Sequence, residues 1–134
     1  MKNKTLHIRF QSLTNFMDEG LSTLAKNKKL VQAKDEIIFA NVASFEQFMT
    51  GQKLHILSAI RTNKPDSIYS LAKMVDRDFA NVSRDCTALE QKGFIQLEDV
   101  GDSRGSKVPQ LTFDYEVIQV HLPTAISYSH NIAA

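Results

Sequence analysis

One short segment of the sequence, DFANVSRDCTALEQKGFI (78–95), carries side chains that could read DNA. It has the pattern of an amphipathic helix, because a capping aspartate, Asp78, begins it, apolar residues recur every three or four positions, and a glycine ends it. Val82, Cys86 and Leu89 fall at i, i+4 and i+7, so they share one face, which we expect to be buried. The small or polar residues of the opposite face are Ala80, Asn81, Ser83, Arg84 and Thr87.

This polar face has a composition suited to the major groove of DNA. Small residues let a helix approach the bases closely, and asparagine and arginine can each make two hydrogen bonds to base edges. Any surface helix of a globular protein has a polar face, however, so the same residues also fit a helix that is simply solvated. The neighbouring segments favour the DNA-reading interpretation.

A shorter helix precedes this one after a tight polar turn. The segment DSIYSLAKMVDRD predicts a helix over about 67–75, and two helices so closely joined form a helix-turn-helix. We expect Ser67 and Tyr69, at its start, to bond phosphate beside the N-terminal amides. Its inward-facing residues are expected to be Ile68, Leu71, Ala72 and Val75.

A hairpin is predicted after the second helix, because two extended apolar runs flank the turn-forming sequence GDSRGS (101–106). A hairpin directly after a helix-turn-helix is a wing. Arg104 and Lys107 lie at its tip, where a wing meets the adjacent minor groove and its negative potential. The alternative is a charged loop exposed to solvent.

Two segments near the N-terminus read as strands, with a helix between them. KTLHIRF (4–10) alternates apolar and polar residues, and EIIFANV (36–42) is short and β-branched. Between them, Ser12 begins a helical pattern over 12–27. The sequence therefore predicts a small strand-helix-strand segment.

Two further helices connect this segment to the helix-turn-helix. Ser44 and Gln47 fit a capping box for a short helix, and Thr50 is placed to cap the next helix, which ends before Pro65. We expect the apolar face of this second helix to contain Leu54, Leu57 and Ile60, with Ile56 close by.

The whole pattern predicts an α+β fold, a winged helix-turn-helix preceded by a small strand-helix-strand segment. The winged helix is expected over 43–122, including a further strand over 115–122, and the strand-helix-strand over 1–42. Residues 123–134 show no sustained pattern and are expected to form a flexible tail.

Composition limits the other classes of function. The chain of 134 residues fits one compact domain, and it has neither a signal-peptide pattern nor a membrane-length apolar run, so we expect a cytoplasmic protein. The net charge of +1, from 16 Lys and Arg against 15 Asp and Glu, counts mildly against DNA, although the local charge governs phosphate contacts.

No catalytic motif appears in the sequence, so we expect neither an enzyme nor a cofactor. The single cysteine, Cys86, is expected to be buried rather than to sense redox state. Metal binding is not expected either, because the four histidines stand singly, without other ligands at metal-binding spacing. They are His7, His55, His121 and His130.

The segment IYSLAKMVDRDFANVSRDCTALEQKGFIQLE resembles the DNA-binding core of MarR-type winged-helix regulators, and the likeness extends from Gly51 to about Phe113. The resemblance implies that Ala72 lets the two helices cross closely and that Asp78 caps the recognition helix. The residues that it implies face the DNA grooves are Asn81, Ser83 and Arg84 on the helix and Arg104 and Lys107 on the wing.

The sequence FEQFMTGQKLHIL and the preceding strand-helix-strand are similar to a group of small MarR-like DNA-binding proteins, some of which resemble antitoxins. The chain lacks the long flanking helices by which MarR proteins dimerise. We therefore expect a double-stranded DNA-binding regulator, a repressor acting as a homodimer through residues 1–42. The alternatives are an antitoxin that binds a protein toxin and autoregulates its operon, and a winged helix used only for protein contacts.

Overall fold

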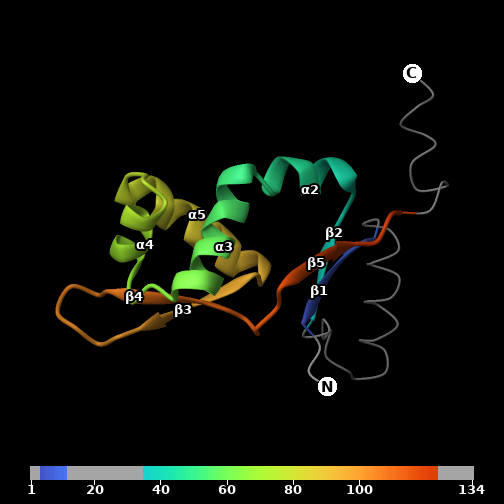
Figure 1. Cartoon of the computed structure of the whole chain (residues 1–134). Coiled ribbons are helices and arrows are strands. Elements are labelled where there is room, and N and C mark those ends of the chain that lie inside the picture. The colour runs from blue at the N-terminus through green and yellow to red at the C-terminus, as the bar shows by residue number, and fades with distance from the viewer. Residues whose placement is uncertain (1–3, 12–34, 124–134) are drawn as a thin grey trace, which may run out of the picture. The chain divides into compact units, whose positions relative to one another are not determined.

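The computed structural model describes residues 4–11 and 35–123, which form two compact units (Figure 1). One unit extends from Met49 to Glu116 and includes Lys4, and the other joins the described residues between Thr5 and Phe48 to those from Val117 onward. The helix expected over 12–27, and all of the expected tail except Pro123, lie outside the described residues. None of the described helices is long and apolar enough to cross a membrane.

Three parallel strands form the sheet of the second unit. They are β1 (Thr5–Phe10), β2 (Glu36–Phe39) and β5 (Val117–Val120), in the order β2-β1-β5. Ile8 of β1 lies opposite Ile37 of β2 and Val120 of β5. Leu6 and Ile8 are fully buried whereas Arg9 is exposed, so the alternation predicted for the first strand is confirmed.

The short helix after β2 begins earlier than the sequence pattern indicated. β2 ends at Phe39, and α2 spans Val42–Phe48. The backbone N–H of Ser44 donates to Asn41 Oδ1 over 2.8 Å, so Asn41 caps the helix and the capping box predicted from Ser44 and Gln47 is wrong. Phe45 of α2 packs edge-on against Phe39, with ring centroids 5.3 Å apart.

In the first unit, α3 spans Gly51–Asn63 and has the predicted boundaries. Thr50 caps it by accepting from the Lys53 N–H over 3.1 Å, and Lys64 ends it in a left-handed conformation with φ 47°. Leu54 was expected on the apolar face but is 46% exposed. The other predicted residues, Ile56, Leu57 and Ile60, are buried as expected, and Ala59 joins them.

The helix-turn-helix and the wing are both present. α4 (Ile68–Met74) and α5 (Phe79–Lys92) are joined by a turn in which Asp76 has φ 55°. After Gly93, β3 (Ile95–Asp99) and β4 (Lys107–Leu111) pair antiparallel, and their connecting loop extends past α4 in Figure 1. The winged helix-turn-helix prediction is confirmed.

A core of fully buried side chains supports these elements. Leu71 of α4, Phe94 and three residues of α5 are 0% exposed, and the buried Tyr115 hydroxyl donates to the Phe94 carbonyl over 2.8 Å. The predicted strand over 115–122 is shorter, Val117–Val120. We expected residues 43–122 to form one unit, whereas this strand pairs with β1 in the other unit.

Candidate nucleic-acid interface

The two faces predicted for α5 are separated in the structure. Val82, Cys86 and Leu89 are fully buried. On the opposite side four of the five predicted residues are exposed and Ser83 is half-buried; the exposed four are Ala80, Asn81, Arg84 and Thr87. The apolar stripe thus anchors the helix and turns its polar side chains to the surface.

A chain of hydrogen bonds runs along the N-terminal half of this exposed face. Asp78 occupies the N-cap position, but its side chain makes no capping bond to the backbone. It accepts instead from the Asn81 amide, whose Oδ1 accepts from the Arg84 guanidinium over 2.9 Å. Among the residues that the structure describes, one of the five guanidinium donors makes a hydrogen bond, so Arg84 is oriented while still able to bind another group.

The wing tip is held by the carboxylate of Asp102. Its Oδ1 accepts from the backbone N–H groups of Arg104 at 3.2 Å and Ser106 at 2.9 Å. The hydrogen bonds from Ser106 and then those from Arg104, with the Arg104 charge, lower the pKa of Asp102, so it is ionised near neutral pH. Gly101 and Gly105 both have positive φ, which glycine adopts readily. Arg104 and Lys107 are therefore presented on an ordered turn.

A groove of about 700 Å³ lies between α5, the start of α4 and the wing. It brings together six of the ten predicted site residues, and these are Ser67, Tyr69, Ser83, Thr87, Arg104 and Lys107. The other four, Asp78, Ala80, Asn81 and Arg84, are exposed on α5 but do not line the groove.

The groove also contains residues that the sequence analysis did not select. The polar or flexible ones are Glu90, Gly105 and Ser106, and the apolar ones are Ile68, Phe79 and Leu97. Glu90 accepts from the Leu97 N–H over 2.9 Å, which links the last turn of α5 to β3. Phe79 is 51% exposed although it follows the helical spacing of the buried residues, so the sequence pattern alone would assign it to the core.

At the start of α4, the Ser67 hydroxyl already caps the helix. It accepts from the Ser70 N–H over 3.0 Å, and the Ser70 hydroxyl donates to Asp66 over 2.6 Å. Tyr69 is exposed, and the Lys73 ammonium lies 4.5 Å from the centre of its ring. The Tyr69 hydroxyl and the Lys73 ammonium are therefore groups that can bind a phosphate. Asp66, in contrast, adds a negative charge beside Ser67, which would repel a phosphate there.

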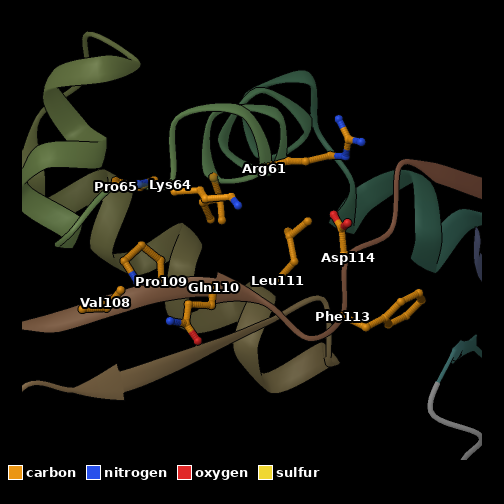
Figure 2. A pocket seen from close by; sticks show the side chains of 10 residues that line it. Arg61, Lys64, Pro65, Val108, Pro109, Gln110, Leu111, Phe113 and Asp114 are labelled. Carbon is orange, nitrogen blue, oxygen red and sulfur yellow. The ribbon is translucent and has the colours of Figure 1, made fainter. Parts of the chain in front are cut away.

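A second, smaller hollow of about 430 Å³ lies between the C-terminal end of α3 and β4 (Figure 2). Leu111 points from β4 toward α3, and Lys64 closes part of the opposite wall. Arg61, which also lines the hollow, pairs with Glu116 at 3.2 Å. Cations, one carboxylate and apolar side chains alternate around it, so the lining favours no single class of ligand.

Cys86 has the environment expected of a structural cysteine. Its side chain is fully buried, and burial, reinforced by the charge of Asp85, raises the pKa of the thiol to about 12. A thiol with so high a pKa forms little of the reactive thiolate near neutral pH. The prediction that Cys86 is buried is confirmed.

Two of the histidines that were predicted to stand singly lie side by side. The parallel pairing of β1 with β5 brings His7 Nδ1 within 2.8 Å of His121 Nε2. Burial and the nearby Arg9 lower the pKa of His121. Among the described residues, no group of three or more histidine, cysteine or acidic side chains is placed to hold a metal ion.

The chain is similar to one protein family and to several solved structures. The family model HVO_A0114 matches residues 48–120, more than half of the chain. No curated protein matches. Similar solved structures include the S. aureus MepR–DNA complex, at 22% identity and TM-score 0.43, covering 74% of this chain and 69% of that one.

Two further solved structures have a comparable level of similarity. MepR, described as a transcription regulator of the Staphylococcus aureus multidrug efflux pump MepA, is 19% identical, with 75% and 66% coverage and TM-score 0.41. Disulfide-formed AbfR is 15% identical, with 74% and 62% coverage and TM-score 0.43. MepR and AbfR are MarR-family winged-helix regulators, the family that the sequence resembles.

Proposed function

We propose that this chain, which belongs to the HVO_A0114 family, binds double-stranded DNA sequence-specifically and regulates transcription. The observation that supports this function best is the groove between α5 and the wing. Its lining includes Ser83 and Thr87 of α5 together with the cations Arg104 and Lys107 of the wing. A helix flanked by a basic hairpin can enter the major groove while the hairpin reaches the phosphates and the minor groove beside it.

The residues divide into two roles in this proposal. Asn81, Ser83 and Arg84, near the N-terminal end of α5, would contact base edges and give sequence specificity. The wing residues Arg104 and Lys107 would contact phosphates and the minor groove, which gives affinity with little dependence on sequence. Ala80 would allow α5 to approach the bases closely, and Thr87 would bind farther along the groove.

The regulator would act as a homodimer that represses by occupying its operator. A single winged helix covers only about 600–1,000 Å² on DNA, which is small for tight and selective binding. Two copies on half-sites about 10 base pairs apart would double the contact. We assign dimerisation to the unit formed by β1, β2 and β5. In this proposal the protein works in the cytoplasm, needs no cofactor and is not an enzyme.

An antitoxin is the second candidate function. The chain has a sheet unit distinct from the winged helix. In this unit β5 exposes Val117 and Val120, and Leu122 is exposed just after the strand. These apolar side chains could bind a protein toxin while the winged helix autoregulates the operon. Co-purification with the product of an adjacent small gene, lost on Val120→Asp and Leu122→Asp substitution, would support this role over a free-standing regulator.

Selection of bound sites from a random pool of duplexes tests the main proposal. We expect a defined sequence to be enriched, and its affinity to fall steeply as salt rises, because each neutralised phosphate contributes a slope of about −0.9 in log affinity against log salt. A winged helix used only for protein contacts would enrich no sequence. A flat salt dependence with no enriched site would therefore overturn the proposal.

A further inference from the structure

We infer that Phe79 recognises the C5 methyl group of thymine in the major groove, an inference that rests on the proposed function. Phe79 is the first residue of α5, and its side chain is 51% exposed. Full burial of a phenylalanine side chain stabilises a fold, and a half-exposed ring forgoes much of that contribution. A partner that covers the Phe79 ring would recover this contribution.

Phe79 lies on the face of α5 that lines the groove. Ser83 and Thr87 follow it one and two turns later, and all three line the same hollow. The ring is therefore on the side of the helix that faces the wing, among residues of the candidate interface. The same groove is lined by the basic wing residues Arg104 and Lys107.

The position of Phe79 along the helix favours a base over a phosphate as its partner. A recognition helix contacts base edges with its N-terminal residues, and Phe79 is the most N-terminal of them in α5. A phenyl ring cannot donate to phosphate. The one apolar group that a base pair presents in the major groove is the thymine methyl, which phenylalanine contacts in known complexes.

Single-stranded nucleic acid is the competing partner, since exposed aromatic rings can stack on unpaired bases. Tyr69, also in the groove and 58% exposed, would be the second ring of such a platform. However, Lys73 lies over one face of the Tyr69 ring and occupies it. The duplex partner is therefore favoured, and single-strand binding is an outcome that the experiment below can detect.

The test uses the full chain and the duplex enriched in the selection above, with each thymine replaced in turn by deoxyuridine, which lacks only the methyl group. We expect one position in each half-site at which the wild type loses about threefold to tenfold in affinity, on the order of one or two buried methyl contacts. Phe79→Ala should lose a similar factor on the thymine duplex and show no preference for thymine over uracil at that position. Phe79→Leu keeps an apolar contact and should retain part of the preference.

Leu54→Ala is the matched control, because Leu54 is exposed to a similar extent on α3 and does not line the groove. It should leave both affinity and thymine preference unchanged. If Phe79→Ala still distinguishes thymine from uracil as the wild type does, or if the single strand binds as tightly as the duplex, the inference is overturned. If the pool yields no enriched duplex, the proposed function itself fails. If a duplex is enriched and bound but Phe79 gives no preference for thymine, only the inference about Phe79 fails.

Discussion

The Arg84 guanidinium donates a hydrogen bond to Asn81 Oδ1 over 2.9 Å, one turn earlier on the exposed face of α5. Asn81 is held in turn by Asp78, so the three side chains form a line from the helix start. An arginine oriented before binding loses less conformational entropy when it contacts a base. In the proposed complex Asn81 would therefore both contact the DNA and position Arg84.

Replacement of Arg84 by alanine should weaken binding to the selected site by about 1–3 kcal/mol and relax base preference at one position of each half-site, as for the loss of a bidentate contact. Asn81→Ala should weaken binding as well, and the double variant should be less impaired than the sum of the two, because the residues are coupled. Titration of labelled duplexes measures this. Gln91→Ala, at the exposed C-terminal end of α5, is the control, and retention of full base preference by Arg84→Ala would contradict the assignment.

Replacement of Arg104 by alanine should weaken binding to most sequences. It should also reduce the slope of log affinity against log salt by about 1, the value for one phosphate contact. The reason is that, in the proposed complex, the wing cation would meet phosphates and the minor groove and not a particular base. Affinities for the selected and a scrambled duplex at several salt concentrations measure the effect. Arg61→Ala removes the same charge from α3, outside the groove, and should change neither quantity. A loss confined to the selected site would show that Arg104 reads sequence.

The Cys86 thiol should be inert in the folded protein and should make stability depend on alkaline pH. Its pKa is raised from 9.0 to about 12, so the folded state favours the protonated thiol. The resulting stabilisation is present in full below about pH 9 and is lost as the pH rises from there through the folded value. Denaturant unfolding from pH 8 to 11 under reducing conditions should show this decline, and Cys86→Ala should remove the part due to the thiol. Rapid labelling of native Cys86 by a thiol reagent near neutral pH would contradict the prediction.

Asp76, in the turn between α4 and α5, has a backbone conformation that disfavours β-branched residues. With φ 55° it lies in the left-handed region, which costs most residues about 1–2 kcal/mol and aspartate or asparagine less. Asp76→Val should therefore lower the unfolding free energy by about that amount. Asp76→Gly should be neutral or slightly stabilising, and Asp76→Asn controls for the lost charge. Equal stability of the valine and asparagine variants in denaturant melts would contradict this account.

The order and type of the described elements could be predicted because local rules govern them. Alternation identified β1, Thr50 and Pro65 set the limits of α3, and the apolar stripe of α5 is buried as expected. Local rules failed where two residues could each cap the same helix. Asn41 and Ser44 are both good caps, and only the point at which β2 ends decides between them.

Features that depend on tertiary contacts were not predictable. Phe79 has the spacing of a core residue, but in the folded chain it is half-exposed and lines the groove. Similarly, nothing in the sequence of 115–122 indicates that this strand pairs with β1, more than a hundred residues earlier. The groove was therefore only partly predicted, through its polar residues.

The pairing of β1 with β5 has a consequence for how the chain folds. A ribosome makes Thr5–Phe10 early and Val117–Val120 late, so this part of the sheet cannot close until nearly all of the described chain has been made. Pairings of such long sequence separation form slowly, and a β1 edge left open in the meantime can join another chain. The helix-turn-helix and the wing, whose contacts are close in sequence, can form first. The nascent chain would then contain a folded winged helix before β1 has paired with β5.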